Sequence, residues 1–415
     1  MAYLPEVSTS PQDSLYVDGF SRQRVAGTGQ RIDVNFIYDK QPDFFDEITS
    51  GASASVTHNA NGRDLTLVAG TVVDTDHATM LSHPVPYTPG NSQLSAKTGV
   101  LDLADIGAGT VEVFLRSSST TGSPQDLEVV TQANWDASLP GSIDWSKSHI
   151  FCLDFQSLKV GRIRFSLVRE GKPEMVAEIS NDNLRDHGYW QLPNLPVCYR
   201  IYNTATETIS EIAYGDENNA VGYRHRQPIN ALASMKAICC TVKSEGGRSL
   251  HELPGLSRVT PLMAARVVSH PAVLLPVLSI RPSAAFKTFD SLVLHMVKHV
   301  HIHADESIDW VLLHQSVLTG AAWVDVDVAA SAMQYDVSAT AVSNGHALDN
   351  GFIYASSSGA KGTALVGAGS EASLLGKTVL WNRRGAETGT LTLAAIRAGS
   401  TQANVKAGFR WEELR

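Results

Sequence analysis

From residue 31 onward, apolar residues come mostly in short alternating runs separated by clusters of Gly, Pro, Asn, Asp and Ser. This pattern of period two, interrupted by turn residues, is typical of β-strands and turns. Residues 162–168 show it most clearly, because Ile163, Phe165 and Leu167 fall on one face and polar residues on the other. A turn within residues 169–172 and a second run at 175–179 complete a predicted hairpin. The pattern predicts an all-β protein.

Further strands are expected along the whole chain. The clearest runs are residues 64–68, 111–116, 291–300, 310–313, 323–328, 378–381 and 390–397. Their spacing is that of antiparallel β-sandwich or jelly-roll domains. Residues 356–368 are small and glycine-rich, so we expect a loop there rather than a phosphate-binding cradle.

The chain is too long for one core, since single cores stop growing at roughly 250–300 residues and this chain has 415. Residues 1–30 lack a periodic apolar pattern and are expected to form an extended N-terminal arm. Turn and linker residues cluster near 245–260. We therefore expect a first β-sandwich domain at 31–250 and a second β-sandwich or jelly-roll domain at 260–415.

Composition narrows the function classes. Hydrophobic residues make up 43% of the chain and charged residues 18%, which is ordinary for a folded protein. The net charge of −9 and the absence of a dense Lys/Arg run disfavour nucleic-acid binding. No apolar stretch approaches the length of a membrane span, and the first residues do not resemble a cleaved signal peptide. The four cysteines show no CxxC spacing, so reduced thiols and assembly in a cytoplasm are expected.

The most conspicuous candidate site is the run His295, His299, His301 and His303. In a regular strand these odd-numbered side chains would all point to one face, and imidazole is a common metal ligand. Neighbouring side chains on one strand face are roughly 7 Å apart, however, which is too far for one ion to bind three of them. We therefore expect a polar sheet surface, one that could face another subunit, that titrates near neutral pH; a metal site is the alternative.

Other candidates are weaker. Asp325 and Asp327 alternate in a predicted strand, as two glycosidase carboxylates could, but acidic residues on a solvent-facing strand are far commoner. Gly27-Thr28-Gly29 lacks the strand and helix of a nucleotide-binding loop, and no hydrolase or zinc-protease motif occurs. Four tryptophans could stack on sugars, although buried indoles are commoner: Trp135, Trp145, Trp190 and Trp381. We assign no catalytic, cofactor-binding or metal-binding residue, and expect no enzyme.

Residues 85–247 resemble a family of tailed-bacteriophage virion structural proteins. The matching segments, in chain order, are Tyr87–Gln93, Arg116–Ser118, Gln132–Trp135, Ile143–Ile150, Leu158–Phe165, Pro193–Val197 and Ile238–Gly247. Residues 391–393 and 409–413 also look like the closing strands of that family. The chain departs from the family pattern at Cys198-Tyr199-Arg200, where Arg-Tyr-Glu is usual, and at Ser166, where a glycine is common.

The resemblance implies a non-enzymatic structural component of a tailed-phage virion, associated with the tail, neck or a fibre, and built by symmetric repetition. Its implied partners are copies of itself and other virion proteins, with no nucleic acid, membrane or cofactor. Two alternatives stay open: a receptor- or glycan-binding spike or fibre protein that contacts a host surface glycan, and a capsid decoration protein. Loop-borne aromatic residues on a β scaffold are a usual basis for such binding.

Overall fold

The computed structural model describes fifteen segments of the chain. These are residues 28–72, 75–87, 91–103, 109–119, 121–135, 143–156, 159–190, 194–229, 233–245, 255–287, 289–291, 293–354, 362–367, 379–381 and 389–414. Most of the predicted arm, residues 1–27, lies outside the described residues. Residues 28–30 belong to strand β1 (Thr28–Asn35), so the first sheet begins three residues earlier than the sequence pattern indicated.

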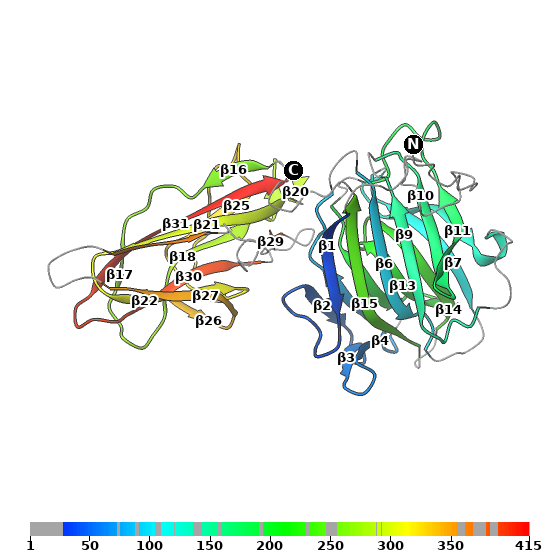
Figure 1. Ribbon diagram of the computed structural model, residues 1–415, viewed down its shortest axis with the longest axis horizontal. Helices are drawn as coiled ribbons and strands as arrows, with labels where there is room; N and C mark the ends of the chain where they lie inside the picture. Colours follow the sequence, from blue (N-terminus) through cyan, green and yellow to red (C-terminus); the bar gives the residue numbers. More distant parts are fainter. Residues whose placement is uncertain are drawn as a thin grey trace, which may run out of the picture. The chain divides into compact units, whose positions relative to one another are not determined.

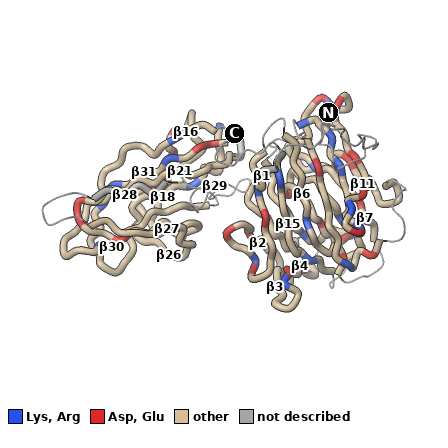
Figure 2. Tube along the Cα trace, viewed as in Figure 1, with Lys and Arg blue, Asp and Glu red and all other residues tan. Residues whose placement is uncertain are grey.

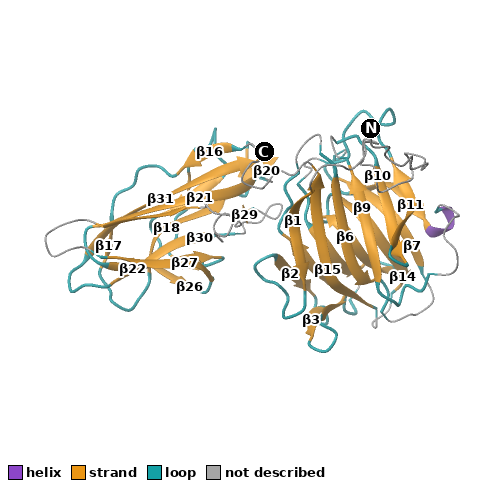
Figure 3. Ribbon diagram, viewed as in Figure 1, coloured by secondary structure: helices purple, strands orange, loops and turns teal. Residues whose placement is uncertain are grey.

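The fold is all-β, as predicted (Figure 3). Every strand pair in the described residues is antiparallel. The helical content of the described chain is one 3-10 turn, η1 (Gln132–Asn134). None of the described segments forms a helix that is long and apolar enough to cross a membrane. The chain divides into two compact units, Met1–Ser249 and Leu250–Arg415, which are described separately.

Unit 1 is a sandwich of an eight-stranded and a seven-stranded sheet. The eight-stranded sheet has the order β11 (Lys172–Ile179), β10 (Ile163–Arg169), β9 (His149–Phe155), β6 (Gln93–Val100), β15 (Ser234–Glu245), β4 (Asp64–Val68) and β3 (Ser55–Asn59), with β1 also paired to β15. The seven-stranded sheet has the order β2 (Phe45–Ser50), β5 (His77–Ser82), β12 (Val197–Asn203), β13 (Glu207–Gly215), β14 (Ala220–Pro228), β7 (Thr110–Ser117) and β8 (Gln125–Thr131). Figure 1 shows β1, β15, β6 and β9 side by side.

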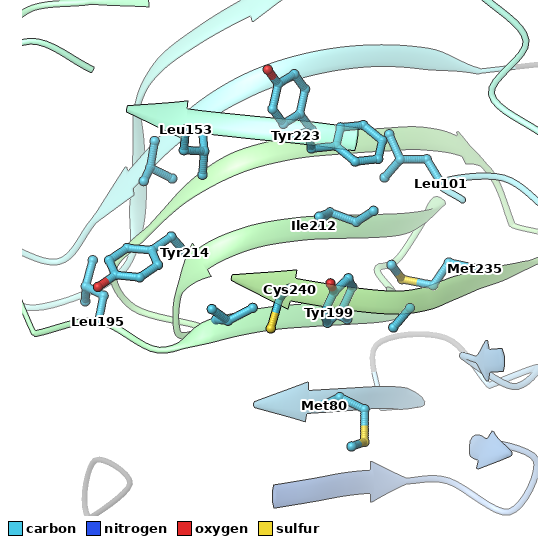
Figure 4. Close-up of a cluster of buried hydrophobic side chains, with 14 of the residues drawn as sticks. Met80, Leu101, Leu153, Leu195, Tyr199, Ile212, Tyr214, Tyr223, Met235 and Cys240 are labelled. Atoms are coloured by element: carbon cyan, nitrogen blue, oxygen red, sulfur yellow. The ribbon is translucent and has the colours of Figure 1, made fainter. Parts of the chain in front are cut away.

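The core of unit 1 lies between these two sheets. Alternate residues of each strand enter it, as the pleat requires; on β10 these are Ile163, Phe165 and Leu167, which the sequence pattern identified. Figure 4 shows part of this core, with Leu153 and Cys240 from the eight-stranded sheet and Tyr199 from the other. Each large apolar side chain buried here contributes roughly 1.5–3 kcal/mol to folding.

Three core tyrosines of the seven-stranded sheet also hydrogen-bond the opposite sheet. Tyr199 Oη donates to the Cys239 carbonyl at 2.7 Å, and Tyr223 Oη donates to the Ser166 carbonyl at 2.9 Å. Tyr214 Oη donates to Gln93 Oε1 at 3.0 Å. A buried phenol without a partner is costly, so these bonds fix where the two sheets lie against each other.

The predicted hairpin is confirmed as β10 and β11. Its two turn residues, Glu170 and Gly171, have φ angles of 48° and 76°. Two positive φ angles in a two-residue turn match the twist of the adjoining strands, and glycine adopts the second without strain.

Unit 2 is a second sandwich, made of two six-stranded sheets. The β21 sheet contains β16 (Leu256–Val259), β31 (Ala403–Leu414), β21 (Leu294–Ala304) and β28 (Gly362–Gly367), with β17 (Arg266–Val268) on β31 and β29 (Val379–Leu380) on β21. The β22 sheet has the order β24 (Val324–Asp325), β25 (Met333–Asp336), β18 (Leu275–Pro282), β30 (Leu391–Arg397), β22 (Ile308–His314) and β27 (His346–Ile353). Two short ribbons add β19 (Ala285–Phe286) with β20 (Phe289–Asp290), and β23 (Val317–Thr319) with β26 (Ala341–Ser343).

The core of unit 2 contains Val300, Trp310, Leu393 and Trp411. The predicted strands at 310–313 and 390–397 correspond to β22 and β30. One prediction is wrong: residues 362–367 of the expected loop form β28, which pairs with β21 from His299 to Ala304. Backbone hydrogen bonds to β21 outweigh the weak strand propensity of its small residues.

Candidate functional site

The four histidines do not share one face. A register shift between Val297 and His299 leaves Lys298 as an extra residue in β21, and such a bulge reverses the alternation beyond it. Val297 precedes the shift and faces the core, so His295, two residues earlier, points inward and is fully buried. Its Nε2 lies 3.9 Å from Glu413 Oε1. His299, His301 and His303 follow the shift and point outward.

Glu413 is itself held in place inside unit 2. Its Oε1 accepts hydrogen bonds from Ser331 Oγ at 2.5 Å, from the Ala332 amide at 3.2 Å and from Trp411 Nε1 at 3.2 Å. The His295 and Glu413 pair therefore belongs to the buried framework. Within the described residues, no group of three or more His, Cys, Asp or Glu is arranged to bind a metal ion.

Asp325 and Asp327 also differ from the expected arrangement. Strand β24 ends at Asp325, whose Oδ1 accepts a hydrogen bond from Gln334 Nε2 at 3.0 Å. Asp327 lies in the following turn, where its Oδ1 accepts the Ala329 and Ala330 amides. By closing a local turn, the Asp327 side chain competes with the hydrogen bonds of a continued strand. Asp325 and Asp327 therefore have different structural roles.

The tryptophans considered as sugar-stacking residues belong to the cores. Trp135, Trp190 and Trp381 are buried, and Trp145 packs against the core of unit 1. The indole nitrogens of Trp135 and Trp145 donate to the Val130 carbonyl and Gln132 Oε1, at 3.0 and 3.1 Å. The three buried indoles are covered by protein and stabilise the fold, and Trp145 is half-buried.

A charged network covers the outer face of the seven-stranded sheet, which the sequence reasoning missed. Glu211 accepts a 2.5 Å bond from Arg116, and Arg224 donates to Glu112 at 2.5 Å. All four side chains are buried although they point away from the core. Figure 2 shows acidic and basic positions interspersed along unit 1. The partners lie on different strands, β7, β13 and β14, so no local spacing signals them.

The ring of Phe114 lies within this network. The guanidinium carbons of Arg116 and Arg224 are 5.0 and 4.8 Å from its centroid, a cation–π arrangement. Burial alone would raise the pKa of Glu211, but the positive charges of Arg116, Arg200 and Arg224 and the Arg116 hydrogen bond lower it to about 2. Glu211 is therefore ionised at neutral pH.

Cys198 and Arg200 of β12 also lie on this face. Cys198 is buried, and the Arg200 guanidinium carbon lies 4.2 Å from the centre of the Tyr202 ring. Tyr202 Oη donates to Glu211 Oε1 at 3.0 Å. Arg200 thus adds a second cation, beside Arg116, that favours the ionised form of Glu211.

An exposed aromatic pair lies at the end of β27, an edge strand of the β22 sheet. Phe352 is 63% exposed and Tyr354 is 71% exposed, while Ile353 between them is buried. The two ring centroids are 4.8 Å apart, at an interplanar angle of 46°. The sequence signal was the apolar triplet Phe352-Ile353-Tyr354, whose alternation sends two aromatic rings to solvent.

Polar side chains lie beside this aromatic pair. Asp309 of β22 is directly opposite Phe352, and Asn350 of β27 is opposite Val311. Asp309 and Asn350 are both exposed. Because directly opposed residues of antiparallel strands share a face, Asp309 and Phe352 project from the same surface. We define Asp309, Asn350, Phe352 and Tyr354 as the aromatic platform.

Comparison with known proteins gives no family. No family model and no curated protein matches the chain. Among solved structures, an endo-1,3-beta-glucanase from Streptomyces sioyaensis is similar, with 11% identity and a TM-score of 0.32, over 53% of this chain and 97% of that chain.

A carbohydrate recognition domain and a legume lectin-like domain are also similar, with lower TM-scores. The metal-free carbohydrate recognition domain of Emp46p has 12% identity and a TM-score of 0.20, over 51% of this chain and 94% of its own. A legume lectin-like domain from Entamoeba histolytica has 12% identity and a TM-score of 0.19, over 52% of this chain and 98% of its own. Neither family membership nor a residue role follows from these likenesses.

Proposed function

We propose that this chain is a non-enzymatic glycan-binding protein and that the aromatic platform is its binding surface. The observation that carries the proposal is the exposure of Phe352 and Tyr354 as adjacent rings at a sheet edge. Removing a large aromatic side chain from water lowers the free energy of the system. Two of them exposed together favour a surface that a ligand covers.

The chemistry of the platform suits a sugar. A pyranose ring has an apolar face of C–H groups and an edge of hydroxyl groups. The rings of Phe352 and Tyr354 match the apolar face, while Asp309 accepts and Asn350 both donates and accepts hydrogen bonds. A few polar groups beside an apolar contact area are typical of specific small-molecule recognition.

The buried carboxylates Glu112 and Glu211 of unit 1 are paired with arginines, which supports binding without hydrolysis. Glycosidic hydrolysis usually needs a carboxylic acid that keeps its proton near neutral pH, next to a second carboxylate. Glu211 has the opposite property, with a pKa of about 2, and Glu112 is paired with Arg224. The platform contributes one carboxylate, Asp309, which is exposed, whereas such hydrolysis uses two.

A glycan array with the full-length chain tests the proposal. We expect binding to one or more glycans, and at least a tenfold weaker affinity after the double substitution Phe352→Ala, Tyr354→Ala. The matched control is Val328→Ala, which removes an apolar side chain that is 74% exposed in the same unit. Equal binding by the double variant, or a change of oligomeric state without a change in glycan binding, would assign the platform to a protein partner instead. Release of reducing sugar from the bound glycan would contradict the non-enzymatic part.

A second proposal concerns where the protein works: it is a structural component of a tailed-phage virion that displays this platform. The support is that segments carrying the family resemblance contact one another. The Tyr87 amide donates to Asn194 Oδ1 at 2.8 Å, across 107 residues of chain. Trp145 Nε1 bonds Gln132, and its ring meets that of Trp135 edge-on at 5.9 Å.

Such contacts are expected if the segments that resemble the family form the framework of a shared fold. Chance matches in the sequence would have no reason to contact one another. Copies of the chain and other virion proteins would then be its partners, and it would assemble in the host cytoplasm. Mass spectrometry of purified particles, followed by location of the chain in an asymmetric reconstruction, tests this. Its absence from particles that package normally would refute the virion role and leave glycan binding untouched.

A further inference from the structure

A row of basic side chains runs along the outer face of the β21 sheet. His299, His301 and His303 point outward from β21, beyond its bulge. Opposite them on β31 are Arg410, facing His299, and Lys406, facing His303. Arg410, Lys406 and His301 are exposed, and the other two are half-buried. We define these five residues as the cationic strip.

The carboxylates next to the strip are already engaged. Glu412 of β31 forms an ion pair with Lys298, the bulge residue, at 3.1 Å. Asp305, at the end of β21, accepts bonds from the amide and the side chain of Asn404 at 2.6 and 2.7 Å. Strand β28, on the other side of β21, contains no titratable residue.

Strand β16, on the other side of β31, contributes a hydroxyl group. Arg410 Nε donates to Ser257 Oγ at 3.2 Å. This bond uses one of the five N–H groups of the guanidinium. Arg410 is exposed, so solvent or a ligand can reach it.

We propose that the cationic strip is a binding surface for an acidic polysaccharide and that binding strengthens as the pH falls through the range in which histidine takes up a proton. It is a second surface, built on the sheet opposite the aromatic platform, and it does not depend on the function proposed for that platform.

The geometry favours a linear polymer over a compact anion. The rings of His299 and His301 are 6.3 Å apart, and the strip from His299 to His303 extends roughly 13 Å at the usual rise of a strand. A single small anion contacts one or two of these cations. A chain with a carboxylate on successive sugars contacts several at once, which multiplies the gain from each weak contact.

The composition of the strip favours a polysaccharide over a nucleic acid. Sequence-independent binding of nucleic acid rests on many Lys and Arg contacts with phosphates. Here the strip has one arginine and one lysine. The other three residues of the strip are histidines, and an imidazole carries a charge only when it is protonated.

The pH dependence follows from the surroundings of His299. Burial lowers its pKa, and the nearby charges of Arg410, His301 and Lys298 lower it further. A bound polyanion opposes those charges and so favours the protonated imidazole. Binding and proton uptake are therefore linked: the ligand raises histidine pKa values, and a lower pH raises the affinity.

Titration calorimetry of the full-length chain with polygalacturonate, at pH 5.5 and pH 7.5 and in two buffers of different ionisation enthalpy, tests the proposal. We expect at least tenfold tighter binding at the lower pH, with net proton uptake. The triple variant His299→Gln, His301→Gln, His303→Gln should lose the pH dependence. Arg410→Gln alone should weaken binding at both pH values, which keeps the test valid if the triple variant misfolds.

Two control variants and two control ligands show whether binding is specific to the cationic strip. His346→Gln, on β27 of the other sheet, should bind like the parent, and so should the Phe352→Ala, Tyr354→Ala variant. Neutral dextran should not bind. Binding that is independent of pH and of all strip variants would overturn the proposal. So would equal competition by an oligothymidylate, which would identify a general polyanion or nucleic-acid surface.

Discussion

The side-chain ammonium of Lys97 donates a 2.8 Å hydrogen bond to Ser95 Oγ inside the core of unit 1. Both residues belong to β6 and lie opposite Phe151 and Leu153 of β9, which are core residues. The Lys97 nitrogen is also 5.7 Å from the centre of the Tyr214 ring. Burial lowers the pKa of Lys97 to about 7, and nearby cysteines offset this only partly. At neutral pH this core therefore holds a lysine that is close to losing its charge.

Stability should rise with pH between 7 and about 8.5 because of Lys97. In the unfolded chain its pKa returns to 10.5, so in this window the unfolded state binds more protons and the free energy of unfolding increases. The maximal slope is about 1.4 kcal/mol per pH unit for one proton. Urea unfolding at pH 6.5, 7.5 and 8.5 measures it. Lys97→Met should be more stable than the parent at pH 6.5 and have a flatter profile; an unchanged profile would contradict the assignment.

Above that window the cysteines act in the opposite direction. Burial raises the pKa of the Cys198 and Cys240 thiols to about 12. Unfolded thiols ionise at lower pH, near 9, so stability should fall as the pH rises further. The gain attributed to Lys97 must therefore be measured below pH 9.

The buried pair Arg224 and Glu112 should be far more sensitive to substitution than an exposed pair of similar length. Arg224→Met leaves the Glu112 carboxylate buried without its 2.5 Å partner, which typically costs about 3–5 kcal/mol. Lys40→Met removes the 2.6 Å pair with Glu47, where both side chains are 35% exposed, and should cost less than about 1 kcal/mol. Denaturant midpoints of the two variants give the comparison. Similar losses would mean that the network is solvated in solution.

Acid should destabilise unit 1 partly through Glu211. Its pKa is about 2 in the folded chain and 4.5 when unperturbed, so the stability it contributes is complete above pH 4.5 and disappears as the pH falls toward 2. Glu211→Gln should lower stability at pH 6 and reduce the decline between pH 5 and 3. Urea unfolding across that range measures both effects. Parallel profiles for parent and variant would show that Glu211 does not titrate on unfolding.

Local alternation in the sequence predicted the all-β class and several strands, because one apolar face of a strand must leave water. It succeeds on β10, where Ile163, Phe165 and Leu167 are the core residues. It would mislead on β6, where Gln93, Ser95 and Lys97 face the core while Leu94 and Ala96 face outward. Gln93 bonds Tyr214, far away in the chain, and Lys97 bonds Ser95 on its own strand. The alternation of apolar residues reveals neither partner.

The candidate sites were less predictable for a related reason. The single-residue bulge at Lys298 turned His295 into the core and left three histidines outside, and strand alternation alone gives no sign of that shift. The Phe352-Ile353-Tyr354 triplet alternates, but its sequence does not say which face meets the core. That assignment, and the position of β27 at a sheet edge, are properties of the assembled fold.

That edge depends on Gly351, and the last prediction concerns it. Gly351 lies opposite Trp310 across β27 and β22, and a Cβ at this position would be 2.9 Å from Trp310 Cζ2. The indole is buried in the core of unit 2 and cannot move without leaving its packing. An added methyl group would therefore push β27, and Phe352 with it, away from β22.

Gly351→Ala should cost about 1–3 kcal/mol, as overpacking of a core usually does, and should also weaken glycan binding by the aromatic platform. Gly399→Ala is the matched control, because a Cβ there would meet only Ser307 Cβ at 3.9 Å. Thermal unfolding and glycan affinity are measured on both variants. If Gly351→Ala lost stability but kept full affinity, the platform would not depend on the position of β27. If it lost affinity at unchanged stability, the strand would relieve the contact with Trp310 by a local shift that displaces Phe352 without unpacking the core.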